Sequence, residues 1–226
     1  MITLTNVSKN FNGKVKALNS VNLTIDKGEF VFIVGQSGAG KSTLIKLLYR
    51  EEVPSQGQVM VLGKDLVRLR RRDVPILRRR IGVVFQDFRL LEDKTVGENV
   101  SFALEVTGTP RREIQKRVNS VITMVGLRDR RDAYPSELSG GEQQRVAIAR
   151  ALVRNPDILL ADEPSGNLDP KTSVEIFSIL ERANMYGTTV VIATHAQDIV
   201  NSLRKRVVEL RYGAVVRDER RGAYSS

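Results

Sequence analysis

The stretch FVFIVGQSGAGKSTLIKLLYR, residues 30–50, decides the fold of this chain. It begins with an apolar run, continues through a glycine-rich turn, and then places apolar residues at helical spacing in LIKLLYR. A wholly apolar strand is typical of a sheet that is covered on both faces. The turn from Gly35 to Ser42 matches G-x-x-x-x-G-K-[ST], the pattern of a P-loop between a strand and a helix. The stretch therefore predicts an α/β protein built around a P-loop.

The glycine-rich turn has the residues that phosphate binding requires. Its glycines allow backbone N–H groups to point at phosphate oxygens, and the positive end of the helix dipole adds to the attraction. Lys41 is predicted to reach the β- and γ-phosphates, and Ser42 to ligate Mg²⁺. A tight glycine turn that binds nothing is the alternative. The residues predicted to bind nucleotide here are Gly35, Ser37, Gly38, Ala39, Gly40, Lys41, Ser42 and Thr43.

A second motif, DILLADE at 157–163, supplies carboxylates at the end of an apolar strand. In open α/β sheets, ligands bind beyond the carboxyl ends of the strands. Asp162 is therefore predicted to hold Mg²⁺, and Glu163 to polarise the attacking water as a general base. An acidic turn without catalytic function is the alternative, since Pro164 and Gly166 follow.

A third motif, LSGGE at 138–142, opens the helical stretch EQQRVAIARALVR. Ser139, Gly140 and Gly141 offer a hydroxyl, free N–H groups and a helix dipole to an anion. One nucleotide does not need two phosphate-binding turns from one chain, but two chains packed head to tail would use both. An ordinary helix capped by Ser139 is the alternative.

Together these motifs resemble those of ATP-binding cassette (ABC) ATPases, and the resemblance covers nearly the whole chain. It implies that ATP and Mg²⁺ bind, and that ATP is hydrolysed in a head-to-tail homodimer. It also implies that Gln86 contacts Mg²⁺ and water, that His195 touches the γ-phosphate, that Phe11 stacks on adenine, and that the loop 165–169 crosses the dimer interface. The alternatives are that His195 is an ordinary surface or core histidine and that Phe11 is a core phenylalanine. The implied catalytic residues are Glu163, His195, Gln86 and Lys41, and the implied Mg²⁺ ligands are Ser42, Gln86 and Asp162.

Strand-like and helix-like segments alternate along the chain, which predicts a mostly parallel sheet with helices around it. The alternating runs 2–8 and 21–25 predict antiparallel strands. We therefore expect the ABC ATPase fold, an α/β protein with a RecA-like P-loop core, an N-terminal antiparallel β-subdomain and an inserted helical subdomain. The predicted organisation is a single domain over 1–226, with the α/β core at 1–86 and 155–226 and the helical subdomain at 87–154.

The segment FQDFRLLEDKTVGENV, residues 85–100, places Phe88, Leu90 and Leu91 among charged residues. Apolar anchors with a charged rim suit a protein–protein socket. The alternative is that the two leucines pack inside the helical subdomain. ABC ATPases receive a helix of an integral membrane subunit at this place, so the resemblance implies such a partner.

Within the family, residues 85–108, together with MITLTNVSKNF and SGNLD, resemble the cell-division ATPases. This resemblance implies that ATP-driven motion is passed through the membrane partner to cell-wall hydrolases. An ATPase subunit of a solute, lipoprotein or drug transporter is the alternative. Gly97 and Ala196 depart from the family pattern, because an aromatic residue and Asp or Asn are common there.

The composition limits the remaining classes of function. The chain has 226 residues, no cysteine and a formal net charge of +10, with basic stretches at 64–80 and 204–221. Such stretches suit anionic lipid, nucleic acid or plain solvation. We expect no nucleic-acid partner, because the long coiled coil of chromosome organisers and the zinc cysteines of excision-repair ATPases are absent. The N-terminus does not read as a signal peptide and no apolar run is long enough to span a bilayer. We therefore expect a peripheral protein on the cytoplasmic face of the membrane.

Overall fold

The structure is a computed structural model that describes residues 1–13, 15–166 and 168–224. The chain forms two compact units, Met1–Arg78 with Thr189–Ser226 and Arg79–Thr188. These are called the first and second unit below, and each is described by itself. The predicted helical subdomain at 87–154 was defined by its helices and not by the compactness of the chain. Its boundaries therefore differ from those of the two units, and the predicted division stays a prediction.

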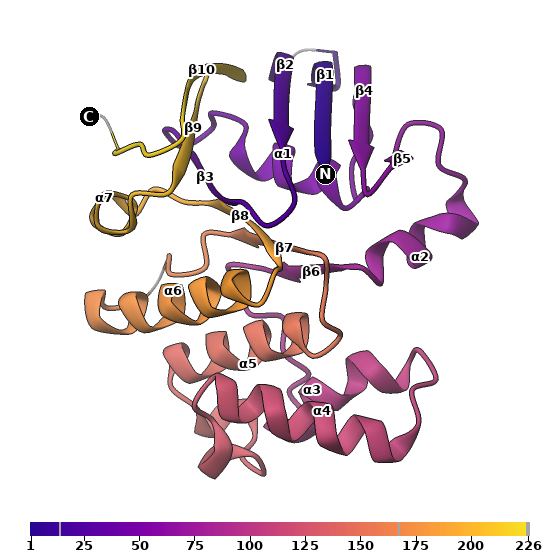
Figure 1. The fold of residues 1–226 in the computed structure, drawn as a ribbon, viewed down its shortest axis with the longest axis vertical. Helices are drawn as coiled ribbons and strands as arrows, with labels where there is room; N and C mark the ends of the chain where they lie inside the picture. Colours follow the sequence, from indigo (N-terminus) through magenta and orange to yellow (C-terminus); the bar gives the residue numbers. More distant parts are fainter. Residues whose placement is uncertain (14, 167, 225–226) are drawn as a thin grey trace. The chain divides into compact units, whose positions relative to one another are not determined.

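The first unit contains an antiparallel sheet in the order β2-β1-β4-β5, in which β1, β2 and β4 run side by side (Figure 1). Along β1, Ile2 and Leu4 are buried at alternate residues, whereas the next buried apolar residue is Val7, because the pairing with β2 is irregular between Leu4 and Val7. The strands of this sheet are β1 (Ile2–Phe11), β2 (Val15–Ile25), β4 (Gln56–Val61) and β5 (Lys64–Asp65).

The first unit also contains the strand that precedes the P-loop. This strand, β3, is buried at every residue and pairs in parallel with β8 and β9, while β10 pairs antiparallel with β9. The strands of this group are β3 (Phe30–Val34), β8 (Thr189–Ala193), β9 (Arg206–Arg211) and β10 (Ala214–Glu219). The helices of the unit are α1 (Lys41–Leu48), η1 (Arg71–Asp73), α2 (Val74–Arg78) and α7 (Gln197–Leu203).

The second unit combines a parallel strand pair with helices. Strands β6 (Ile81–Val84) and β7 (Ile158–Asp162) pair in parallel. The predicted helices lie between these two strands in the sequence. Helices α3, α4 and α5 pack against one another (Figure 1). The helical elements are α3 (Val96–Glu105), α4 (Arg111–Met124), η2 (Arg128–Arg130), η3 (Pro135–Glu137), α5 (Gly140–Leu152) and α6 (Pro170–Met185).

Side-chain caps fix where the helices of the second unit begin. Thr95 and Ser139 each form a capping box with the glutamate three residues later. Asp169 caps α6 by accepting a hydrogen bond from the Thr172 N–H at 3.0 Å, and Pro170 takes the first helical position. Among the described residues, no helix has both the length and the apolar character that crossing a bilayer requires.

Candidate nucleotide-binding site

The P-loop of the first unit is shaped by glycines that no other residue can replace without strain. Gly35 and Gly40 have φ values of +142° and +104°. A Cβ on Gly35 would overlap the backbone carbonyl oxygen of Leu210, and one on Gly40 would overlap that of Ala17. The loop is thus held against β9 and β2, and Gln36, Ser37 and Gly38 are left exposed. A cavity of ≈ 220 Å³ borders this loop.

Helix α1 begins at the P-loop with features that favour an anion. Its first turn contains no acidic residue, and Gly40 at the N-cap provides no side-chain cap. Lys41 is buried, and its Nζ donates hydrogen bonds to the carbonyl oxygens of Gly35 at 2.8 Å and Gln36 at 3.3 Å. Ser42 is exposed and Thr43 half-buried in the same turn. The turn therefore fits the phosphate chain of a nucleotide, with the ammonium group folded over the loop.

His195 lies at the same end of the strands as the P-loop. In the parallel pairing of β3 and β8, Ile33 is opposite Ala193. Gly35 and His195 each follow two residues later, so both lie beyond the carboxyl ends of adjacent strands. His195 is exposed, as a ligand contact requires.

Phe11 ends strand β1 of the first unit and is half-buried. The ammonium group of Lys9 lies 4.8 Å from the centroid of its ring. One side of the ring is thus in a cation–π contact, and the residue is not a buried core phenylalanine.

The second unit brings the two predicted water-contacting residues together. Asp162 ends strand β7, and Glu163 follows in the left-handed region with φ +49°. The Glu163 carbonyl accepts a hydrogen bond from the Gly166 N–H at 3.1 Å, which closes a tight turn. A Cβ on Gly166 would lie 3.2 Å from Gln86 Nε2 and 3.5 Å from the Glu163 Cβ, so these residues share one small region. Residues other than glycine in the left-handed region are often found at functional sites.

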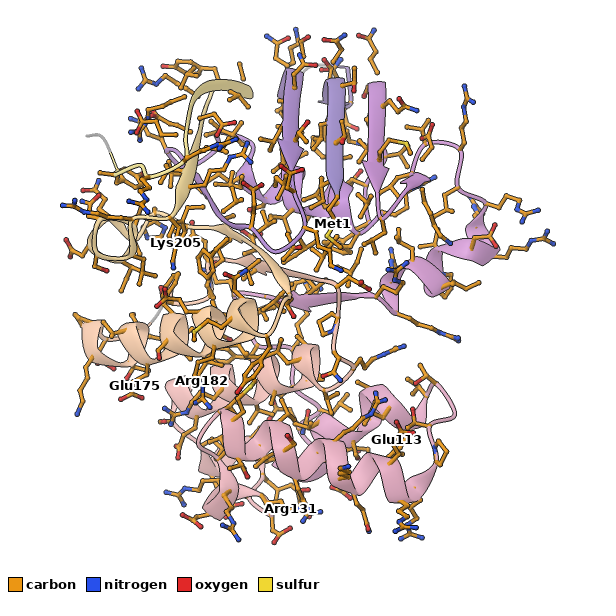
Figure 2. All side chains as sticks on the ribbon, in the orientation of Figure 1. Met1, Glu113, Arg131, Glu175, Arg182 and Lys205 are labelled. Carbon is orange, nitrogen blue, oxygen red and sulfur yellow. The ribbon has the colours of Figure 1, made fainter. Side chains whose placement is uncertain are left out.

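The LSGGE motif at 138–142, called the signature motif below, places Gly140 and Gly141 at the start of α5, where the two glycines differ in their surroundings. Gly140 is exposed, whereas Gly141 is buried, and a Cβ on Gly141 would overlap the Thr172 side chain of α6. Close packing of α5 on α6 therefore requires glycine at 141. An ion pair of 2.7 Å between Arg145 and Glu175 joins the same two helices, and Figure 2 labels Glu175 on α6. Of the loop 165–169, Asn167 lies outside the described residues.

The loop after Gln86 is held by two side chains that the sequence analysis did not single out. Phe88 and Arg89 both have positive φ, and their carbonyl oxygens accept hydrogen bonds of 2.9 and 2.6 Å from the Arg150 guanidinium of α5. Desolvation lowers the pKa of Arg150. The other residue is the fully buried Asn99, which accepts a hydrogen bond from the Leu91 N–H.

The amide group of Asn99 completes this clamp by donating to three carbonyl oxygens, those of Leu91, Lys94 and Thr95. The predicted partner anchors Phe88, Leu90 and Leu91 are half-buried, so each has both packed and accessible surface. The only sequence signal for the clamp was a polar residue at a buried position of an amphipathic helix.

The fold and these motifs define a P-loop ATPase of the cassette type. The profile described as ABC transporter matches residues 18–166, and the chain belongs to this family. It is therefore an ABC ATPase that binds ATP, and the resemblance seen in the sequence is confirmed.

Relatives and solved structures agree with this assignment. The chain is 54% identical over 226 residues to the "Cell division ATP-binding protein FtsE" of Bacillus subtilis (strain 168), covering 100% of this chain and 99% of that protein. It is 56% identical over 225 residues to the protein of the same name in Mycobacterium tuberculosis (strain ATCC 25618 / H37Rv), covering 99% and 98%. The "Methionine import ATP-binding protein MetN" of Halalkalibacterium halodurans is 46% identical over 222 residues, covering 96% of this chain and 66% of that protein.

A solved dimeric cassette, MJ0796 bound to ADP and Pi, superposes with a TM-score of 0.88 at 38% identity, covering 99% of this chain and 100% of that one. A second dimeric structure of MJ0796 gives a TM-score of 0.89 at 39% identity, covering 99% and 100%. The predicted α/β fold class of the cassette ATPases is therefore confirmed.

Proposed function

We propose that this chain is the ATP-hydrolysing subunit of an FtsE–FtsX-type complex that acts in cell division. The observation that carries the proposal is the presence of two helices that begin at glycine-rich turns, one at Lys41 and one at Gly140, in a chain similar over its full length to FtsE proteins. In this proposal, closure and opening of an ATP-dependent dimer are transmitted through an FtsX-type membrane protein to cell-wall hydrolases.

In the first unit, the P-loop backbone from Gly35 to Gly40 binds the phosphates, and Lys41 exchanges its bonds to the loop carbonyls for bonds to phosphate oxygens. Such charge-assisted bonds are about twice as strong as neutral ones. His195 contacts the γ-phosphate from the end of β8. Phe11 stacks on the adenine through the face of its ring that is not covered by Lys9.

In the second unit, Glu163 accepts a proton from the attacking water, and the Gln86 side chain orients that water. Their placement beside Gly166 supports this pairing of roles. Ser139, Gly140 and Gly141 of one chain close over the nucleotide of the other, and the dimeric state of the similar cassette MJ0796 supports a dimer here. Each P-loop would then complete its site with the partner chain's signature motif.

The proposed Mg²⁺ ligands are Ser42, Gln86 and Asp162. Magnesium takes few protein ligands and keeps several waters, so a hydroxyl, an amide and one carboxylate fit its chemistry. The described residues contain no group of three or more histidine, cysteine or acidic side chains that could hold a metal by themselves. When bound, the ion would neutralise charge on the phosphates.

The substitution Glu163→Gln tests the catalytic proposal. It removes the proton acceptor but keeps the shape of the side chain, so we expect ATP to bind, hydrolysis to fall at least about 100-fold, and a dimer to persist in ATP and Mg²⁺. Sedimentation velocity measures the dimer, and phosphate release measures hydrolysis. A variant that turns over normally and stays monomeric would refute the assigned base and dimer.

We place the membrane partner at Phe88, Leu90 and Leu91, with Gly97 nearby. Helices α3 and α4 border a groove of ≈ 550 Å³ whose lining includes Gly97, Ile114 and Arg131. Gly97 contributes no side chain to this groove. Phe88, Leu90 and Leu91 are not among the residues that line this groove, so the proposed socket is the half-buried surface of those three residues themselves.

Co-purification tests this socket. The Glu163→Gln chain is co-expressed with its FtsX-type protein, with and without Leu90→Asp, and Val174→Asp serves as a control at an exposed apolar position of α6. We expect only Leu90→Asp to abolish capture while the ATP-dependent dimer is retained. Retained capture would refute the socket.

A transporter subunit is the second candidate, because MetN proteins reach 46% identity. The chain spans 66% of that relative's length but 99% of the FtsE relative's. Stimulation of the ATPase by a solute-binding protein and its permease would favour transport over division.

We further propose that the basic stretch 64–80 contacts anionic lipid while the subunit is held at the cytoplasmic face. The Arg78 guanidinium makes hydrogen bonds within the protein, because it donates to the carbonyl oxygens of Tyr49 and Arg50. Arg71 and Arg72 are exposed, and the apolar Ile76 is 49% exposed beside them. Arginine next to exposed apolar surface suits a lipid interface.

Vesicle sedimentation tests the lipid contact. Vesicles containing phosphatidylglycerol should bind the protein, and Arg71→Glu with Arg72→Glu should weaken binding more than Arg111→Glu with Arg112→Glu does. Equal effects of the two pairs would refute this surface. Salt-sensitive binding to DNA that depends on the same arginines would favour nucleic acid instead.

A further inference from the structure

The signature serine of α5 is already engaged by a carboxylate. The Ser139 hydroxyl donates to Glu142 Oε2 at 2.8 Å, and the Ser139 N–H donates to the same oxygen at 2.9 Å. The Glu142 N–H in turn donates to Ser139 Oγ at 3.3 Å. A hydroxyl has a single proton to donate. While this arrangement holds, the hydroxyl proton of Ser139 is not available to a phosphate oxygen.

The carboxylate also brings a negative charge close to where a phosphate would lie. A phosphate oxygen accepting from Ser139 Oγ would sit at most about 5.5 Å from Glu142 Oε2, given ordinary hydrogen-bond lengths of about 2.7 Å. Two negative charges at this separation repel each other.

One cation of the second unit faces this carboxylate. Arg130 Nε lies 3.2 Å from Glu142 Oε1, on the oxygen that Ser139 does not use. The Arg130 side chain is 55% exposed and that of Glu142 is 17% exposed, so the pair lies at the surface next to the exposed Ser139. The hydrogen bonds from Ser139, and then the charge of Arg130, hold the pKa of Glu142 below its ordinary value.

We propose that Glu142 and Arg130 together set how tightly the signature motif binds the partner chain's nucleotide. Glu142 opposes closure by holding the Ser139 proton and by repelling phosphate, and Arg130 offsets this charge. Arg130 is thus a positioning residue that acts through Glu142 and touches no substrate itself. The inference rests on the proposed ATP-dependent dimer.

The test measures dimerisation of the Glu163→Gln chain in ATP and Mg²⁺ by sedimentation velocity. Glu142→Gln keeps the capping box and an oxygen that accepts from Ser139, so it removes only the negative charge and tests the repulsion. We expect it to tighten the dimer about tenfold, equivalent to about 1.4 kcal/mol. Arg130→Ala should weaken the dimer by a similar factor, and Arg130→Lys should stay near the parent because it keeps the charge.

Two further variants separate this role from a structural one. When Glu142→Gln is present, Arg130→Ala should have no further effect, because no carboxylate remains to be neutralised. Glu98→Gln alters the equivalent capping box of α3, where Thr95 is the cap, and should leave dimerisation unchanged.

Three results would overturn the inference. These are an unchanged or weaker dimer in Glu142→Gln, an equal loss from Arg130→Ala in both backgrounds, or the same tightening from Glu98→Gln. A parent chain that fails to dimerise with ATP would overturn the proposed function as well, so the two failures are distinguishable.

Discussion

Replacing Asn99 with leucine should destabilise the second unit strongly, although the two side chains have similar size. The Asn99 side chain is fully buried and makes four hydrogen bonds to the backbone of Leu91, Lys94 and Thr95. Its two amide protons are shared among three carbonyl oxygens, so the loss is equivalent to about three hydrogen bonds. At about 1 kcal/mol each, the free energy of unfolding should fall by about 3 kcal/mol.

Equilibrium unfolding in urea measures this loss. Asn119→Leu, on the exposed face of α4, makes the same chemical change where no buried bond is lost and should shift stability by less than about 0.5 kcal/mol. A loss below about 1 kcal/mol in Asn99→Leu would show that the clamp contributes little. The reasoning about the loop after Gln86 would then fail.

Asn99→Asp adds a pH signature to the same site. A carboxylate there would face the carbonyl oxygens of Leu91, Lys94 and Thr95 in a buried position, so folding should raise its pKa. A raised pKa means that the folded form takes up the proton more readily, and stability returns as the pH falls through that pKa. The gap in unfolding free energy between parent and variant should therefore shrink between pH 7 and pH 5. A constant gap would contradict the buried, donor-poor site.

The remaining predictions concern the ends of the helices. Arg150→Met should release the loop after Gln86 and cost about 2–5 kcal/mol in urea unfolding, because two bonds to a charged donor are lost; an unchanged midpoint would contradict this. Gly141→Ala should lower the melting temperature, and adding Thr172→Ser should restore much of it by removing the overlapping methyl group; no rescue would mean that the clash is not the cause. Hydrogen bonds from Thr95 lower the pKa of Glu98, and hydrogen bonds from Thr172 lower that of Asp169, so the stability they add is present at neutral pH and lost as the pH falls below about 4; unfolding midpoints that stay constant from pH 6 to pH 3 would argue against it.

The sequence was sufficient for the parts of the fold that rest on strong local patterns. The wholly apolar run 30–34 predicted β3, and DILLA predicted β7, because burial on both faces leaves a continuous apolar run. The strands β4 and β10 were not predicted. Gln56–Val61 begins with polar, exposed residues, and Ala214–Glu219 is a half-exposed, charged strand, so neither has a clear period.

Site residues that belong to a sequence motif could be predicted. Residues whose role depends on a contact with a distant part of the chain could not. The glycines of the P-loop have positions fixed by their neighbours' backbone, and their spacing carries that information. Arg150 and Arg130 act through partners 61 and 12 residues away, and no local pattern distinguishes them from other surface arginines. The pairing of Glu142 with Ser139 was open to sequence reasoning, because a serine followed three residues later by glutamate is a capping box.

Helix α5 connects the functional segments of the second unit through hydrogen bonds at separate points along its length. Ser139 caps its first turn. The Gln144 side chain donates a hydrogen bond of 2.7 Å to the carbonyl oxygen of Pro164, which follows the proposed base. The Arg150 guanidinium donates a hydrogen bond of 2.9 Å to the carbonyl oxygen of Phe88. From the first to the last of these points the helix rises by about 15 Å. A helix is stiff over this length, so a shift of Ser139 toward a nucleotide must carry the other two contacts with it or break them. Breaking the hydrogen bonds at both places costs more than moving them together. The signature motif and the loop that is proposed to face the membrane partner should therefore respond to nucleotide as one body.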